Sequence, residues 1–450
     1  MKAKSMIAGC SALVSCILMA SGAPQVSAVE MSQETFGRLV TIKYKLSSTP
    51  AVVTLDVETN ATDGTWASIG GAPVSNARGS VWRKVESSEA DENGFYTITW
   101  RPDLSWEGHN IAEGGARAKV TAWALDNTPD YMVVDLSDGA ATGSQEYYTS
   151  ADHLPGGILA NTEYRTTKLL MRKIMAKDVK WTMGSTSIES QRREDLEATH
   201  PVMLTNNFYI GVFPVTQTQW AIVATNSDTK AQFSHVDYMM MRPMEYVSYN
   251  EIRMQANSTS VNTYAKEWPN PPYSRSFLGL LNLRTGLDFD LPSEAQWEFA
   301  ARAGNGAGKW GDGTSVHSAN PDANLAKLAR YKFNGGMIGE TSNVEPTPYD
   351  KCGPQNGTAI VGSYEKNSWG LFDVHGNVFE WCLDWRVDDI SDLSGAVNNV
   401  EPQTSKLKVA RGGAWNGESR LCRAAFRHAF DPVTRSAIIG FRVACTAGLK

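Results

Sequence analysis

The stretch that decides the fold is Leu291-Pro-Ser-Glu-Ala-Gln-Trp-Glu-Phe-Ala-Ala-Arg-Ala-Gly304. Ser293 is a favoured helix N-cap, and Gln296, three residues later, completes the capping-box pattern. Gly304 stands where helices commonly end. Side chains three and four residues apart share one face of a helix, and here that face is formed by Trp297, Ala300 and Ala301. The pattern predicts a short helix whose Trp/Ala face packs into a core.

Further motifs surround this helix in a fixed order. They are Trp181-Thr-Met-Gly-Ser185, Phe208-Tyr-Ile-Gly211, Val215-Thr-Gln-Thr-Gln-Trp220, Arg242-Pro-Met-Glu-Tyr-Val-Ser-Tyr249, Gly370-Leu-Phe-Asp-Val-His-Gly-Asn-Val-Phe-Glu-Trp381, Arg411-Gly-Gly-Ala-Trp415 and Gly440-Phe-Arg442. Together with the helix segment they resemble, in order, the signatures of the formylglycine-generating-enzyme (sulfatase-modifying factor) family. The resemblance covers about residues 170–445. It implies an α+β domain over residues 169–450, a loop-rich variant of the C-type-lectin-like fold.

Residues 33–136 show the pattern of β-strands instead. Apolar and polar residues alternate in Thr41-Ile-Lys-Tyr-Lys-Leu46 and in Phe95-Tyr-Thr-Ile-Thr-Trp100, as they do in half-buried strands. Tyr131-Met-Val-Val-Asp-Leu136 is the last of several denser apolar runs. We expect an all-β sandwich of the immunoglobulin or fibronectin type over 33–136, serving as a spacer or docking module. A linker rich in Gly, Ser and Thr is expected over 137–168.

The N-terminus has the features of an export signal. A basic start precedes the apolar run Met6–Ala20, and Val26-Ser27-Ala28 offers small residues for cleavage. We predict a signal peptide over 1–28 and a secreted, periplasmic or cell-envelope protein. The alternative is processing at Cys16 as a lipoprotein.

The net charge excludes some classes of binding partner, and the cysteine content allows disulfides. The formal net charge is −6 at pH 7, which argues against nucleic acid or an anionic membrane as partner, because both are bound by basic surfaces. Beyond the N-terminal segment no apolar stretch is long enough to span a bilayer. In an oxidising compartment the remaining cysteines can form disulfides, whose pairing the sequence leaves open. These cysteines are Cys352, Cys382, Cys422 and Cys445.

One segment has the composition of a calcium site. Asp373 and Glu380 bracket Gly376, which permits a sharp bend, and calcium takes six to eight oxygen ligands. The resemblance implies a structural calcium ion, held by the side chains of Asp373 and Glu380 and by the backbone carbonyls of Gly376 and Val378. Alternatively, the two carboxylates cap turns or pair with an arginine.

The redox centre implied by the resemblance is incomplete. The family oxidises a substrate cysteine to formylglycine with Cu(I) held by two thiolates, and soft thiolate ligands select that metal. The matching positions, five and ten residues after Gly412, are Gly417 and Cys422. With one thiolate missing, we expect no copper-dependent oxidation by the family's route. Either Cys382 or Cys445 folds next to Cys422 as a substitute, or Cys422 is a buried or disulfide-bonded cysteine, which we favour.

A ligand-binding cleft is expected from the same part of the sequence. Trp415, Arg423, Phe426 and Arg427 interleave aromatic and guanidinium groups, which suit a peptide, a glycan or an anionic group. The alternative is core packing, and we expect other arginines to brace loops. Those arginines are Arg411 and Arg442.

These features predict an exported protein whose family domain lacks copper oxidase activity. It would act as a ligand- or protein-binding module for an exported protein, a peptide or a glycan. The alternative is an oxidoreductase that converts a cysteine of a substrate protein to formylglycine, with Cys422 as its catalytic residue.

Overall fold

The computed structural model of the protein describes residues 23–448, except 35–36, 61–63, 110–113, 138–142, 190, 225–239, 255–270, 318–319, 335–356 and 388–404. Cys16, Cys352 and most of the predicted signal peptide lie outside the described residues. Within the described ranges, no helix has the length and apolar character needed to cross a membrane.

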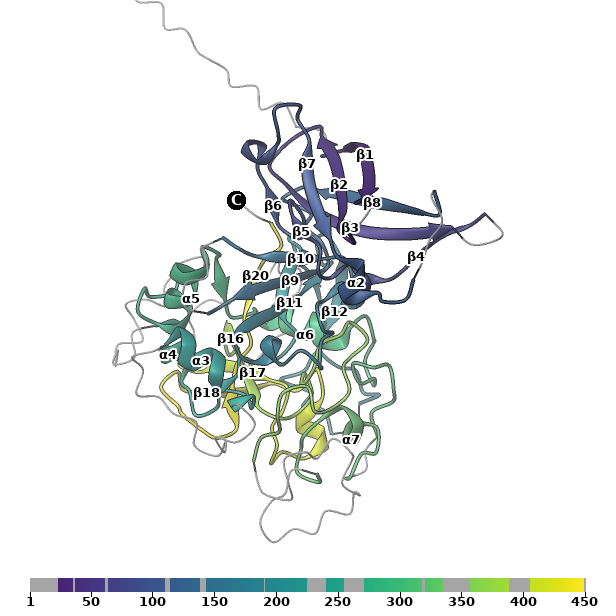
Figure 1. Ribbon diagram of the computed structural model, residues 1–450. Helices are drawn as coiled ribbons and strands as arrows, with labels where there is room; N and C mark the ends of the chain where they lie inside the picture. The colour runs from purple at the N-terminus through teal and green to yellow at the C-terminus, as the bar shows by residue number, and fades with distance from the viewer. Residues whose placement is uncertain are drawn as a thin grey trace, which may run out of the picture.

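Two β-sheets form the N-terminal part of the molecule, at the top of Figure 1. The first sheet has the order β1 (Val26–Gln33), β2 (Val40–Leu46), β7 (Tyr96–Trp100) and β5 (Arg78–Gly79). In the second, β3 (Ala51–Asn60) pairs with β4 (Trp66–Ser68), β6 (Lys84–Val85) and β8 (Ala116–Trp123). The alternation seen in the sequence is confirmed, because β2 and β7 bury every second residue. Ile42 and Ile98 thereby share one core with Leu55 of β3.

A six-stranded sheet lies below the two N-terminal sheets and begins the C-terminal part. Its order is β10 (Glu146–Tyr148), β9 (Tyr131–Asp135), β11 (Lys168–Ile174), β14 (Phe208–Gly211), β20 (Ala444–Thr446) and β15 (Phe289–Asp290). The chain's last strand therefore lies inside the sheet, between two strands from distant parts of the sequence.

The position of β9 differs from the expectation that it closes the sandwich. Tyr131–Asp135 pairs with β11 and β10 instead. Its side chains are buried on both faces: Met132 joins the core of the C-terminal part, whereas Val133 joins the core shared with the N-terminal sheets. The segment 137–168, expected as a linker, likewise contains β10 and the buried Tyr164. The two parts of the chain therefore share a continuous core rather than being joined by a free linker.

Two smaller sheets complete the C-terminal part. One pairs β12 (Lys180–Met183) with β13 (His200–Met203). The other has the order β18 (His428–Phe430), β17 (Lys408–Arg411), β16 (Phe379–Trp385) and β19 (Ile439–Gly440). The motif segment 370–381 leads into β16, and the R-G-G motif follows from the end of β17.

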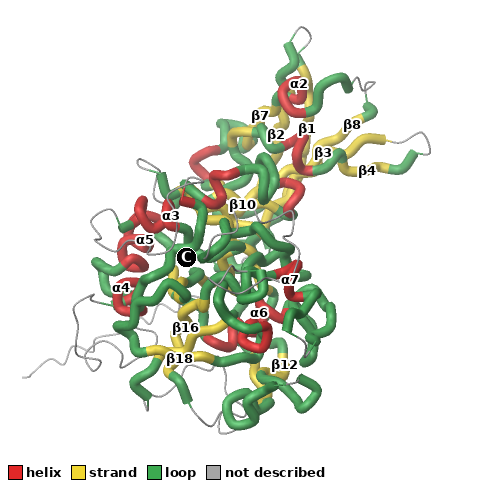
Figure 2. The backbone as a smooth tube through the Cα atoms, turned by 90° about the horizontal axis from the view of Figure 1, so that it is seen from below, coloured by secondary structure: helices red, strands yellow, loops and turns green. Residues whose placement is uncertain are grey.

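Helices are short, and loops make up much of the C-terminal part (Figure 2). The predicted helix is confirmed as α6 (Glu294–Arg302), with Ser293 as N-cap and Gln296 completing the capping box. Trp297, Ala300 and Ala301 are buried, as predicted. The other helices among the described residues are α1 (Gly71–Val74), α2 (Pro102–Ser105), α3 (Gln217–Val223), α4 (Tyr249–Arg253), α5 (Phe277–Thr285) and α7 (Leu325–Leu328). Short 3-10 turns are η1 (Ser87–Glu89), η2 (Ala151–His153), η3 (Thr162–Arg165) and η6 (Ser419–Cys422).

Candidate functional site

The R-G-G motif forms a sharp turn against Cys422. Gly412 and Gly413 follow β17 with φ values of 97° and 81°, a region that side chains other than glycine rarely occupy. A Cβ atom on Gly413 would lie 2.6 Å from Cys422 Sγ. Glycine at this position therefore lets the thiol lie directly against the backbone of the turn.

Cys422 itself is enclosed. It ends η6, has no exposed surface, and packs among apolar side chains that include Trp310, Leu325 and Tyr331. Burial raises the pKa of its thiol to about 12. A thiol in this state stays protonated at neutral pH, so it is neither a good nucleophile nor a ready metal ligand.

No second thiol lies beside Cys422 among the described residues. Gly417 fills the other matching position, and its amide donates to the Ala414 carbonyl. Cys382 and Cys445 are both free and belong to two other hydrophobic clusters, so neither replaces the missing ligand. Cys352 lies outside the described residues. The residues that the structure places here do not fit a two-thiolate copper site.

Arg423 is a buried structural arginine, which corrects the expectation that it lines a cleft. Its guanidinium group is 1% exposed and lies 2.6 Å from Glu189 Oε2 and 2.7 Å from Glu197 Oε2. Glu189 and Glu197 are themselves buried. The three side chains tie the loop after β12 to the end of η6, and no face of the arginine is open to a ligand.

The other three expected cleft residues are also in the core. Arg427 contacts both carboxylate oxygens of Glu294, at 2.6 and 2.7 Å. Trp415 donates its indole N–H to the Ala437 carbonyl, and Phe426 packs beside Phe379. Each is at most 7% exposed. The expected cleft is therefore not formed by these side chains, because the aromatic rings are packed and the cations are already paired.

The predicted bracing role of the other two arginines is confirmed. Arg411 bonds to Glu294 and Glu298 on α6, which fastens the helix to β17. Arg442 bonds to Glu380 and to the carbonyls of Gly211 and Phe372. Buried ion pairs of this kind are strongly destabilising to break, because the remaining charge is left without a partner.

The expected calcium ligands have other partners. Both Glu380 oxygens lie 2.6 Å from nitrogens of Arg442, and one of them also accepts the Trp297 indole N–H. The two Asp373 oxygens accept from Asn377 and from the Gly362 amide. These four oxygens are arranged around N–H groups rather than around a cation. As placed, the two carboxylates do not fit a calcium site.

In this arrangement the pKa of the Asp373 carboxyl group is shifted. Burial raises the pKa of Asp373 to about 6, against the opposing effect of the Gly362 amide and of the nearby Arg442. The carboxyl therefore takes up a proton at a higher pH than an exposed aspartate does, and it accepts a hydrogen bond from the Gly362 amide.

Sequence reasoning missed His375, which ties the motif of residues 370–381 to Cys422 and to the loop at Gly311. Its Nδ1 lies 2.8 Å from the Cys422 carbonyl and its Nε2 lies 3.0 Å from the Gly311 amide. Because a carbonyl only accepts and an amide N–H only donates, the ring is neutral with its proton on Nδ1. Burial lowers its pKa to about 4. The only signal was its place inside the motif of residues 370–381.

Lys408 was missed as well. Its ammonium group lies 3.9 Å from the ring centroid of Trp385 and 4.7 Å from that of Tyr249, and it donates to the Leu383 carbonyl. Burial lowers its pKa to about 7. The side chain is enclosed on all these sides, so it links α4 to β16 and β17.

Parts of this chain are similar to known proteins. The formylglycine-generating enzyme of Thermomonospora curvata is 32% identical over 162 residues, which is 34% of this chain and 48% of that enzyme. The serine/threonine-protein kinase pkn1 of Chlamydia pneumoniae is 24% identical over 286 residues, covering 63% of this chain and 39% of the kinase. The chain therefore spans less than half the length of these curated relatives.

A solved structure and a family model complete the comparison. The structure of PvdO from Pseudomonas aeruginosa aligns with a TM-score of 0.45 and 23% identity over 62% of this chain and 94% of that chain. The model of the sulfatase-modifying factor enzyme 1-like domain matches residues 171–447. With more than half of its length matched, the chain belongs to the family of the sulfatase-modifying factor enzyme 1-like domain.

Proposed function

We propose that the protein is an exported member of this family whose domain binds a ligand or a protein and does not carry out copper-dependent oxidation. The partner would be an exported protein, a peptide or a glycan, bound by a loop-rich domain of C-type-lectin-like fold. One observation carries the proposal: Cys422 is completely enclosed, and Gly417 stands where the second thiol is required.

The chemistry of copper supports this choice. Cu(I) is held by soft thiolates, and a site with one thiol of pKa about 12 offers very little thiolate at neutral pH. Apolar and aromatic side chains that include Trp310 and Tyr331 surround the thiol, and the nearby Asp322 carboxylate further disfavours the thiolate. The domain has several buried arginine–glutamate pairs that hold its framework together, and its surface loops are left for binding.

The expected cleavage site of the export signal lies within β1, at an irregular point of its pairing. The pairing of β1 with β2 shifts register between Ser27 and Glu30, and Ala28 has a φ of 50°. Cleavage after Ala28 would leave the segment Glu30–Gln33 paired with β2 as it is. N-terminal sequencing of the protein recovered from the periplasm or medium should give Val29 first. Lipid-modified Cys16 at the N-terminus would contradict this cleavage.

The oxidase alternative is tested with a cysteine-bearing peptide and Cu(I). We expect no oxygen uptake above the buffer and no formylglycine in the peptide by mass spectrometry. Formation of formylglycine that depends on Cys422 would overturn the proposal.

Binding is tested with arrays of glycans and of peptides from exported proteins. The parent and Cys422→Ser should bind the same array elements, because Cys422 lies in the core and not on the binding surface. Two arrays without any signal would contradict the binding role.

A further inference from the structure

The strand β1 lies at one end of its sheet, and its pairing with β2 is interrupted (Figure 1). Val26 lies opposite Leu46 and Ser27 opposite Lys45, after which the register shifts and pairing resumes at Glu30. A bulge of this kind divides the strand into two short ladders. The first ladder ends just before the expected cleavage site of the export signal, and the second begins just after it.

The residues before the cleavage site hold a defined place on β2. The Ser47 amide donates to the Gln25 carbonyl at 3.0 Å, and the Gln25 amide donates to Ser47 Oγ at 2.9 Å. Val26 is partly buried against the core of the N-terminal sheets, as is Leu46 on the facing strand. The segment therefore occupies a site that offers main-chain hydrogen bonds and one apolar contact.

Cleavage after Ala28 would remove this segment and leave its place on β2 vacant. On its other side β2 pairs with β7 only as far as Tyr44, so among the described strands β1 is the ladder partner of Lys45 and Leu46. A vacated strand edge exposes N–H and C=O groups that can pair with another chain. The mature protein would therefore present a short strand edge with one uncovered apolar contact.

The segment that is removed indicates what can replace it. A peptide that adds to such an edge gains main-chain hydrogen bonds, and its alternating side chains give specificity. The position of Val26 faces the core and suits a β-branched apolar residue. The next position lies opposite Lys45. It suits a polar or acidic residue, because opposite charges on facing strands attract each other.

We propose that the vacated edge of β2, at residues 45–47, binds an extended segment of an exported partner protein. The segment adds as an antiparallel strand, with a β-branched apolar residue in the place of Val26 and a polar or acidic residue after it. This proposal rests on the proposed function, because it requires export with cleavage after Ala28, and it assigns the protein-binding role to one place. It uses none of the residues around Cys422.

The test compares two forms of the protein that differ only in where they begin. One begins at Val29, and the other begins at Ala23 and so retains its own residues on the edge. The probe is a fluorescent peptide with the sequence of residues 23–28 and blocked termini, which removes the terminal charges. Fluorescence anisotropy should show binding to the form that begins at Val29. Binding to the other form should be about ten-fold weaker, since an attached segment competes at an effective concentration on the order of mM.

Two variants of the peptide test the register of binding. Val26→Asp places a charge against the core and should weaken binding by about ten-fold or more. Ser27→Asp is the matched control, because it introduces the same side chain one residue further along, opposite Lys45. It should leave the affinity unchanged or raise it by about two-fold.

Several outcomes would overturn the proposal. One is the absence of binding to the form that begins at Val29 at about 1 mM peptide, and another is equal affinity of the two forms. Equal losses for Val26→Asp and Ser27→Asp would also contradict it. Dimerisation of the form that begins at Val29, without peptide binding, would assign the edge to a second copy instead. N-terminal sequencing that does not give Val29 would refute the proposed cleavage, whereas these titrations test the edge itself.

Discussion

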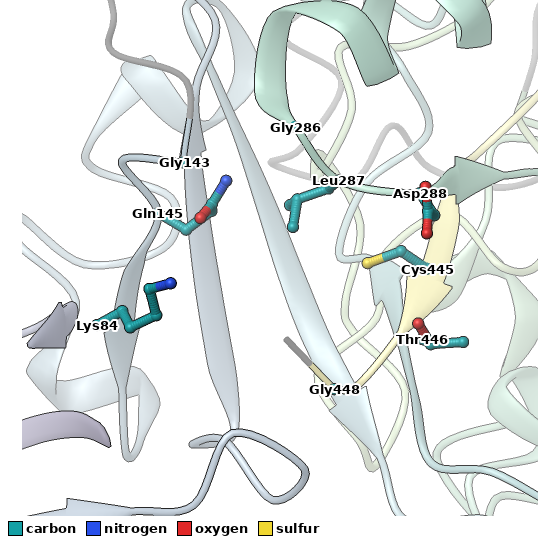
Figure 3. Close-up of a pocket in the computed structure, with 9 residues that line it drawn as sticks. All are labelled: Lys84, Gly143, Gln145, Gly286, Leu287, Asp288, Cys445, Thr446 and Gly448. Carbon is teal, nitrogen blue, oxygen red and sulfur yellow. The ribbon is translucent and has the colours of Figure 1, made fainter. Parts of the chain in front are cut away.

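Two thiols of the C-terminal part, Cys422 and Cys445, are both buried, but only Cys445 borders open space (Figure 3). Cys422 follows the R-G-G motif and is enclosed by apolar groups, and the neighbouring Arg423 is paired inside the protein. Cys445 belongs to no motif, yet it lines a cavity with Lys84 and Asp288 on its walls. The comparison shows that the strongest motifs of this chain build the framework, whereas open polar space lies where the sequence gives no motif.

The largest effect is expected from breaking the buried arginine pair. Arg423→Met leaves Glu189 and Glu197 buried without their cation, and removing one partner of a buried pair costs about 3–5 kcal/mol. Urea unfolding should show this loss as a lower midpoint.

Lys84→Met, which removes a lysine on the cavity wall, is the matched control for that change. Its stability should stay within about 0.5 kcal/mol of the parent, as for most surface substitutions. Equal stabilities of Arg423→Met and Lys84→Met would contradict the distinction between a framework region and an open region.

The second largest effect is expected in the pH dependence of folding stability, to which His375 contributes. An unfolded histidine binds a proton below a pH of about 6.5, whereas His375 in the folded protein does so only below about 4. The unfolded state therefore holds more protons between these values, and stability falls as the pH falls through this window. The shift corresponds to a contribution on the order of 3 kcal/mol.

His375→Phe separates this contribution from others. The raised pKa of Asp373, about 6, acts in the opposite direction, because that carboxyl binds a proton more readily in the folded state. The unfolding free energies of the parent and of His375→Phe are measured from pH 7 to pH 4 and subtracted. Because both proteins contain Asp373, its contribution drops out of the difference. The difference should shrink as the pH falls, and a difference independent of pH would refute the assigned role of His375.

The sequence predicted the local features of the fold and missed those that depend on distant partners. The capping box of α6 and the alternation in β2 and β7 were found because their signals lie within a few residues. The strand β9 was expected in the sandwich, because an apolar run buried on both faces looks the same in either sheet.

The candidate site shows the same limit. Arg423 meets its carboxylates 234 and 226 residues away in the sequence, so nothing near it indicates that it is already paired. The bracing roles of Arg411 and Arg442 were predicted correctly, yet the sequence offered no means of separating them from Arg427. The cavity escaped notice because its walls come from segments that meet only in the folded chain.

A smaller effect is expected from Cys422→Ser. The hydroxyl group is more polar than the thiol, but it lies near the Glu418 carbonyl, which Cys422 Sγ approaches to 3.9 Å. We expect a loss of about 1 kcal/mol in urea unfolding, typical of a modest change in hydrogen bonding in the core. Alkylation of Cys445 should proceed at the parent rate, and a changed rate would show that the two regions are coupled.

The smallest effect is expected from calcium. Because Arg442 and Trp297 occupy the Glu380 carboxylate, a chelator or added calcium should leave the melting temperature unchanged. A melting temperature that rises with calcium and does so less in Asp373→Asn would restore the calcium site.

The sharpest measurement is a Cu(I) titration of the parent and of Gly417→Cys against a colorimetric chelator. The new side chain fits with small shifts, since a Cβ atom at Gly417 would lie 3.2 Å from the Ala414 carbonyl oxygen and 3.3 Å from Leu421 Cδ1. We predict that the parent leaves the chelator's copper untouched and that Gly417→Cys removes it, an effect abolished by adding Cys422→Ser. Stoichiometric Cu(I) binding by the parent, lost in Cys422→Ser, would contradict a framework role for Cys422.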